Sequence, residues 1–133
     1  MDATRPTVLV VADDASLRAA LESVLGSLGY RVLTSAEPDS AYALLGRESV
    51  DAVLMDVRLP TISGLALSLA IVHRWPHLQD RVAFMTADAD APDVQPWLQL
   101  HHSTVFQKPF RFEQLAHWLD TTLQGRDREA AGS

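Results

Sequence analysis

The sequence contains no cysteine and no long apolar run. The absence of cysteine excludes disulfide bonds and thiolate metal sites. No apolar stretch approaches the roughly 20 residues that a membrane-spanning helix needs, so we expect no membrane association. The first residues, Met1–Pro6, carry no apolar targeting segment. These absences together predict a cytoplasmic location.

Basic residues are also in short supply. The chain has 11 Lys and Arg against 17 Asp and Glu, which gives a formal net charge of -6. Nonspecific nucleic-acid binding relies on a basic surface that neutralises phosphates, so we expect no nucleic-acid partner. An acidic chain instead favours a cation or a basic protein partner.

The length and composition fit one globular domain. The 133 residues are 47% hydrophobic and 21% charged, which is typical of a soluble protein with a proper core. The chain is too short for a catalytic domain plus a separate reader, so we look for a single site. We predict one domain over residues 1–125. A disordered polar tail over 126–133 should follow it.

Apolar runs alternate with helical patterns along the chain. The five runs that predict strands are 7–11, 31–34, 53–56, 82–85 and 104–107. Five segments predict helices: 15–28, one that begins at Pro38, one from Gly64 to Pro76, a short or irregular one within 87–100, and one over 112–123. Pro92 and Pro96 work against a regular helix in the fourth segment. Two parallel neighbouring strands must be joined by a crossover connection, which is usually an α-helix. This alternation therefore predicts an α/β fold with a five-stranded parallel sheet covered on both faces.

Polar side chains follow four of the predicted strands. Asp13 and Asp14 come after the first strand and Asp56 ends the third. Thr86 follows the fourth strand and Lys108 the fifth. In open parallel sheets these carboxyl ends share one edge, where ligands bind. Carboxylates close together repel unless a cation lies among them, and an all-oxygen set suits Mg²⁺. The set predicts a phosphoryl-accepting site with Asp56 as nucleophile, Thr86 as hydroxyl donor and Lys108 as point charge.

Taken singly, these motifs are weak. Asp13-Asp14 alone is more often a helix N-terminal cap than a metal site, and only its combination with the other strand-end residues reverses that preference. The five histidines have no metal-ligand spacing with acids, so we expect them at the surface.

The chain resembles the receiver domains of two-component response regulators over essentially its whole folded length. The matching motifs are the acids after the first strand, Asp56-Val57-Arg58-Leu59-Pro60 with Ser63-Gly64, Thr86-Ala87, and Lys108-Pro109-Phe110. The resemblance implies a doubly wound, flavodoxin-like sheet of order 2-1-3-4-5. It also implies that Asp56 takes a phosphoryl group from a histidine kinase or a histidine phosphotransfer protein. Mg²⁺ would then be required, with the backbone carbonyl of Arg58 completing the metal shell beside Asp13 and Asp56.

Two positions depart from the family pattern. An ungapped comparison places Ala12 at the first acid and Asp13 at the second, which leaves Asp14 outside the pair. The other register pairs Asp13 with Asp14 and removes one loop residue, so Asp14 is a possible metal ligand. We favour the ungapped register because the spacing to Asp56 then needs no adjustment. The second departure is Val105, which stands where many receivers carry a Tyr or Phe. Phe106, one place further, should face the other side of the strand.

Three functions compete. The first is a phosphorylation-controlled signalling module, which is not an enzyme beyond its own phosphotransfer and dephosphorylation. The second is a pseudo-receiver, a constitutive protein-interaction domain, which only Ala12 favours. The third is a phosphatase with an aspartyl nucleophile, which usually needs a second Asp at the place of Arg58 as acid or base. For the first function we expect the downstream protein or homodimer surface on the fourth helix, fifth strand and fifth helix.

Overall fold

Five parallel strands form one sheet. The computed structural model describes residues 5–132, and side chains for residues 5–123. The strands are β1 (Thr7–Val11), β2 (Arg31–Ser35), β3 (Ala52–Asp56), β4 (Val82–Thr86) and β5 (Thr104–Gln107). Their order in the sheet is β2-β1-β3-β4-β5, and every neighbouring pair is parallel. The predicted doubly wound, flavodoxin-like fold is confirmed.

Five helices connect and cover the strands. They are α1 (Ala15–Ser27), α2 (Pro38–Arg47), α3 (Gly64–Arg74), α4 (Gln95–Leu100) and α5 (Phe112–Gly132). The first turns carry the expected signals: Pro38 begins α2, and the Ser63 side chain accepts a hydrogen bond from the Ala66 N–H at the start of α3. After α1, Gly29 adopts a φ of 101°, which glycine tolerates best.

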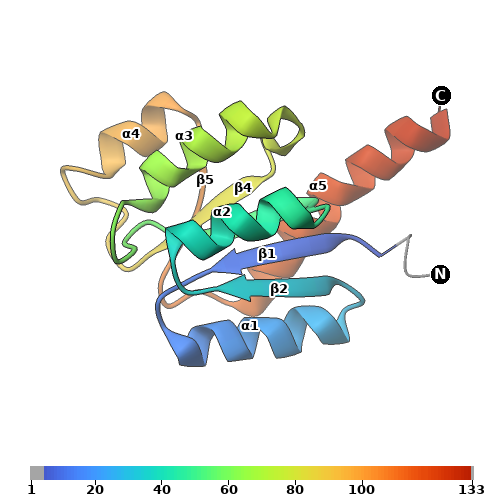
Figure 1. Ribbon diagram of the computed structural model, residues 1–133, viewed down its shortest axis with the longest axis horizontal. Coiled ribbons are helices and arrows are strands. Elements are labelled where there is room, and N and C mark those ends of the chain that lie inside the picture. Colours follow the sequence, from blue (N-terminus) through green and yellow to red (C-terminus); the bar gives the residue numbers. More distant parts are fainter. Residues whose placement is uncertain (1–4, 133) are drawn as a thin grey trace.

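Helices cover both faces of the sheet (Figure 1). The side chains of the strands divide into two apolar clusters, one on each face. Along β1, Leu9 and Val11 pack with residues of α2, α3 and α4, whereas Val8 and Val10 pack with α1 and α5. This alternation follows from the period of two of a strand. The central strands β1 and β3 are buried along their whole length, as expected for a parallel sheet between helical layers.

The strand register brings the candidate residues to one edge. Asp56 lies opposite Met85, which is the residue before Thr86. Thr86 in turn lies opposite Gln107, which is the residue before Lys108. The ladder continues past the strand end, since the Lys108 N–H donates to the Thr86 carbonyl over 2.7 Å. The third, fourth and fifth strands therefore deliver their polar side chains to neighbouring positions.

The prediction of a short or irregular fourth helix is confirmed, because α4 has only six residues and begins at Gln95, with Pro96 in its first turn. Two other segments differ from the prediction. A 3₁₀ turn, η2 (Pro76–Leu78), follows α3 and was not predicted. α5 runs to Gly132, through the segment 126–133 for which we predicted disorder. Most residues there favour helices, so the helix end lies later than expected, and disorder of the segment stays a prediction.

Among the described residues, no helix combines the length and the apolar character that crossing a bilayer requires.

Candidate functional site

Asp56 is a buried carboxylate with one cationic neighbour. The residue is only 5% exposed. Its Oδ1 lies 2.7 Å from Nζ of Lys108, whose side chain is 32% exposed and so reaches the site from the solvent side. Oδ1 makes this ion pair without a hydrogen bond of good geometry to any described residue. The oxygen is therefore held beside a positive charge and keeps the capacity to bind an electrophile or a cation.

Burial decides the protonation behaviour of Asp56. Desolvation raises the pKa of this carboxyl above its ordinary value. The ion pair with Lys108 and the backbone N–H of Asp13 lower this pKa without outweighing burial, and the charge of Asp14 raises it further. A buried carboxylate with a raised pKa is more basic than an ordinary Asp, which favours attack on an electrophile.

The two acids after β1 have different surroundings. Asp13 and Asp14 are both exposed, and the Asp13 backbone N–H faces the Asp56 carboxylate. Oδ1 of Asp14 accepts hydrogen bonds from the backbone N–H groups of Ser16 (2.8 Å) and Leu17 (3.2 Å), so it caps α1. One Asp14 oxygen is thus committed to the helix.

Ala12 is fully buried in the apolar cluster that faces α1 and α5. The guanidinium of Arg18, one turn into α1, donates from Nη1 to the carbonyl of Ala12 (2.7 Å) and also to that of Asp13 (3.1 Å). Arg18 therefore fixes the backbone that leads out of β1. Sequence reasoning missed this contact, for which the only available signal was a basic residue four places after Asp14 on the predicted helix.

The Thr86 hydroxyl is turned toward its own loop. Its Oγ1 accepts a hydrogen bond from the backbone N–H of Asp88 over 3.1 Å. A hydroxyl has one donor and two acceptor sites, so the Thr86 O–H can still be donated. Thr86 is only 4% exposed. The structure thus places a hydroxyl donor on the strand next to Asp56, at the start of the loop that leads to α4.

Gly64 packs directly against the backbone of Asp56. A Cβ added to Gly64 would lie 2.0 Å from the Asp56 carbonyl oxygen, which is far inside van der Waals contact. The Gly64 N–H also donates to the Val57 carbonyl over 2.7 Å. The absence of a side chain at residue 64 therefore allows α3 to begin beside the phosphoacceptor candidate.

The oxygen donors at this edge fit Mg²⁺. Within residues 5–123, no three histidine or acidic side chains lie close enough together to hold a metal ion by themselves. Mg²⁺ does not need such a cage, because it is usually held by one or two carboxylates together with waters and a phosphate oxygen. The buried Asp56 Oδ1 without a directed hydrogen bond is the observation that favours a hard cation here. Asp13 and Asp56, with the Arg58 carbonyl, would hold it.

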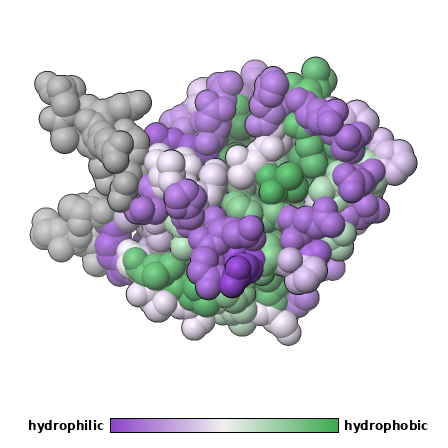
Figure 2. Space-filling model, turned by 180° about the vertical axis from the view of Figure 1, so that it is seen from behind, coloured by the Kyte–Doolittle hydropathy of each residue, from purple (hydrophilic) through white to green (hydrophobic). Residues whose placement is uncertain are grey.

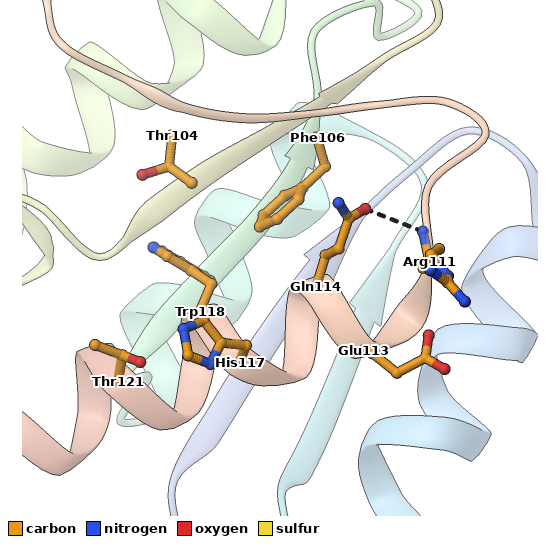
Figure 3. Close-up of a pocket in the computed structure, with 8 residues that line it drawn as sticks. All are labelled: Thr104, Phe106, Arg111, Glu113, Gln114, His117, Trp118 and Thr121. Carbon is orange, nitrogen blue, oxygen red and sulfur yellow. Dashed lines mark hydrogen bonds between the residues drawn. The ribbon is translucent and has the colours of Figure 1, made fainter.

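An apolar groove lies between β5 and α5. Its volume is about 690 Å³, and its lining residues include Phe106, Gln114, His117 and Trp118. In Figure 3 the Phe106 ring from β5 and the Trp118 ring from α5 point toward the same space, while Gln114 bonds the backbone of Arg111 at one end. Figure 2, which views the molecule from behind, shows apolar surface ringed by polar residues.

The remaining predictions about single residues can be compared with burial. All five histidines are exposed, as predicted. Val105 and Phe106 pack in the clusters on opposite faces of the sheet, which confirms their expected orientation. Trp97 and Trp118 are both partly buried, so each contributes to the core and to the surface.

Comparisons with known proteins agree on one family. The model of the response regulator receiver domain matches residues 8–120. The probable transcriptional regulator ycf27 of Guillardia theta is 28% identical over 98% of this chain and 50% of its own length. The transcriptional regulatory protein AfsQ1 of Streptomyces coelicolor is 30% identical over 96% of this chain and 56% of its own length.

A solved structure is also similar. The non-phosphorylated HemR receiver domain of Leptospira biflexa superposes with a TM-score of 0.77 at 28% identity, over 89% of this chain and 94% of that one. The chain spans about half the length of the two curated relatives, so it corresponds to one part of those proteins.

Proposed function

Because the chain belongs to the response regulator receiver domain family of two-component systems, we propose that it accepts a phosphoryl group on Asp56 from a phosphohistidine donor and thereby switches a partner-binding surface. The observation that carries this proposal is the buried Asp56 carboxylate, whose Oδ1 lies 2.7 Å from Lys108 Nζ and has no directed hydrogen bond among the described residues.

The transfer follows from the positions of three side chains. An Asp56 carboxylate oxygen attacks phosphorus, and the bond between phosphorus and the donor imidazole nitrogen breaks with its electron pair going to that nitrogen. Lys108 neutralises charge on the phosphoryl oxygens, and the Thr86 hydroxyl donates a hydrogen bond to one of them. Asp13, Asp56 and the Arg58 carbonyl, joined by Asp14 in the alternative register, would hold Mg²⁺, which would supply positive charge to offset the negative charge of the phosphoryl group. Hydrolysis reverses the state when water attacks phosphorus and the bond to Asp56 breaks.

Membership of the receiver family supports the proposed partners. The donor is a histidine kinase or a histidine phosphotransfer protein, and the expected location is cytoplasmic. The output surface is the α4–β5–α5 face, where either a downstream protein or a second copy of this chain binds. The groove between β5 and α5, with Phe106 and Trp118 in its wall, supports this assignment because aromatic side chains at the edge of a pocket are typical anchors for partners.

The test is incubation with a small-molecule phosphodonor and Mg²⁺, followed by intact-mass measurement. We expect one phosphoryl group on the wild type and none on Asp56→Asn, with Asp90→Asn, an exposed acid of the β4–α4 loop, behaving as the wild type. An undiminished added mass in Asp56→Asn would contradict the assignment of the acceptor. No added mass on the wild type would favour the pseudo-receiver, a reading that the fully buried Ala12 supports. Rapid multiple turnover would favour a phosphatase.

A further inference from the structure

An ion pair joins the loop after Asp56 to the start of α4. Nη1 of Arg58 lies 2.7 Å from Oδ2 of Asp93, and Nη2 lies 3.1 Å from Oδ1, so the contact is bidentate. Arg58 follows Asp56 by two residues, and Asp93 precedes α4 by two. The pair spans 35 positions of sequence and connects the loops that follow Asp56 at the end of β3 and Thr86 at the end of β4.

The start of α4 has few other attachments. The helix has six residues, contains Pro96 in its first turn and lacks a side-chain hydrogen bond at its N-cap, Val94. The hydrogen bonds just before it are local, from the N–H groups of Val94 and Gln95 to the carbonyl of Ala91. The loop between β3 and α3, here called the phosphoacceptor loop, meets this segment through the apolar cluster that contains Leu59, Ala91 and Val94. Among the described residues, the Arg58–Asp93 pair adds a direct polar contact between the two.

The guanidinium of Arg58 lies among the acids of the β4–α4 loop. Asp93 and, more weakly, Asp88 raise the pKa of Arg58, and Arg58 lowers the pKa of Asp93. Both side chains of the pair are more than half exposed, at 60% and 63%. An exposed pair can exchange partners readily, because water solvates each group when the other leaves. The fork geometry nevertheless defines one orientation while the pair is formed.

We propose that the Arg58–Asp93 ion pair is a latch that holds the start of α4 against the phosphoacceptor loop in the unphosphorylated protein, and that phosphorylation of Asp56 opens it. The second half of this proposal rests on the proposed function. A phosphoryl group adds about -1.5 to -2 charges and strong acceptor oxygens two residues from Arg58. This new anion competes with Asp93 for the guanidinium. Once Asp93 is released, the segment before α4 is free to follow Thr86.

The test is hydrogen–deuterium exchange of the backbone N–H groups of Ala91, Val94 and Gln95. In the unphosphorylated protein we expect Asp93→Asn to speed their exchange about two- to fivefold, the effect of losing one surface ion pair. Asp90→Asn is the control. Asp90 lies in the same loop but has no described contact with Arg58, so the backbone amides of this variant should exchange at wild-type rates. The double exchange Arg58→Asp with Asp93→Arg should restore slow exchange, because it rebuilds an ion pair with reversed polarity.

Phosphorylation supplies the second arm of the test. Wild type treated with phosphodonor and Mg²⁺ should exchange at these amides as fast as unphosphorylated Asp93→Asn, and phosphorylated Asp93→Asn should show little further increase. Unchanged exchange in unphosphorylated Asp93→Asn would overturn the latch. Slow exchange in a wild type that carries the phosphoryl group by intact mass would overturn its opening. A wild type without added mass would overturn the proposed function, while the unphosphorylated arm still decides whether the latch exists.

Discussion

At the scale of single residues, the site combines one buried acid with neighbours that only partly compensate its burial. Lys108 lies 2.7 Å from Asp56 Oδ1, but desolvation still raises the pKa of the acid. Burial therefore destabilises the ionised form of Asp56, and a cation bound beside it, or covalent modification, would relieve this cost. Two small residues, Gly64 and Ala12, lie near this site. Gly64 packs against the Asp56 backbone, and Ala12 is buried in an apolar cluster.

Gly64→Ala should destabilise the fold and impair phosphorylation. The added Cβ would lie 2.0 Å from the Asp56 carbonyl oxygen, so either the start of α3 or the end of β3 must shift. We expect a loss of about 2 to 4 kcal/mol in the free energy of unfolding, as for other overpacked buried sites. Gly46→Ala in α2 is the matched control, because its Cβ would meet no atom within 4 Å. It should stabilise the protein by about 0.5 to 1 kcal/mol. Equal urea midpoints for the two variants would contradict this.

Ala12→Asp should tighten Mg²⁺ binding while it destabilises the metal-free protein. Ala12 is fully buried among apolar side chains, so an ionised carboxylate there lacks solvation without a cation. With Mg²⁺ present the extra negative charge attracts the ion. We expect a metal-free loss of about 1 to 3 kcal/mol and a lower Kd in a Mg²⁺ titration. No gain in affinity would favour the other register, in which Asp14 already supplies the missing acid.

At the scale of elements, β4 and α4 form the route away from the site. Phe84 of β4 packs edge-on against Trp97 of α4, with ring centroids 5.6 Å apart, and Trp97 in turn lies 4.0 Å from the ring of His101. Val105 packs against the same cluster but is too short to signal by a large rotation. Movement after phosphorylation must then involve the backbone between Thr86 and the first turn of α4, where Pro92 and Pro96 already interrupt regular structure.

Trp97 should report phosphorylation by its fluorescence. Drawing the Thr86 hydroxyl toward a phosphoryl group moves the loop that leads to α4, and Trp97 lies on that helix against Phe84. Trp97→Phe should lose most of the fluorescence change that phosphodonor and Mg²⁺ produce, since Trp75 and Trp118 lie elsewhere. An equal change in wild type and Trp97→Phe would rule out this route.

Thr86→Ala should reduce the same fluorescence change, because it removes the hydroxyl that donates to the phosphoryl group. The substitution also removes the acceptor of the Asp88 N–H, so Thr86→Ser, which keeps the hydroxyl, is the control. A full change in Thr86→Ala would exclude the hydroxyl as the trigger. We expect a modest coupling free energy, about 1 to 3 kcal/mol, between phosphorylation of Asp56 and partner binding at the α4–β5–α5 face.

At the scale of the whole molecule, Asp56 makes stability depend on pH. Its pKa is raised in the folded state, so the folded protein binds this proton more tightly than the unfolded chain. Stability therefore falls as pH rises from the ordinary Asp value of 3.8 through the folded pKa, and the loss is complete above that pKa. Asp56→Asn has no such charge and should be more stable at pH 7, on the order of 1 kcal/mol.

The difference between Asp56→Asn and wild type should shrink as pH falls and vanish below the unfolded pKa. Urea unfolding of both proteins across this range measures it, and Asp90→Asn should show no comparable gain. Saturating Mg²⁺ should stabilise the wild type more than Asp56→Asn, because a ligand that binds only the folded state raises its stability. A wild type more stable than Asp56→Asn at pH 7 without metal would contradict the argument.

Several features were determined by the sequence alone. Runs such as Val8–Val11 and Val53–Met55 are apolar on both faces, so they are stable only inside a parallel sheet between helical layers. That requirement, with the alternation of strands and helices, determines the fold class and collects Asp56, Thr86 and Lys108 at one edge. The absence of regular helix before α4 also follows locally, from the prolines.

Only the tertiary structure decided the contacts between segments distant in sequence. Asp14 could be a cap or a metal ligand by its residue type, and the orientation of α1 turns its Oδ1 toward the helix N–H groups. Arg58 and Asp93 are 35 positions apart, and no local pattern predicts that two exposed loops bring them together. The proximity of Gly64 to the Asp56 carbonyl likewise depends on how α3 packs on β3. Local sequence specifies which elements form, whereas side-chain partners depend on the packing of the whole chain.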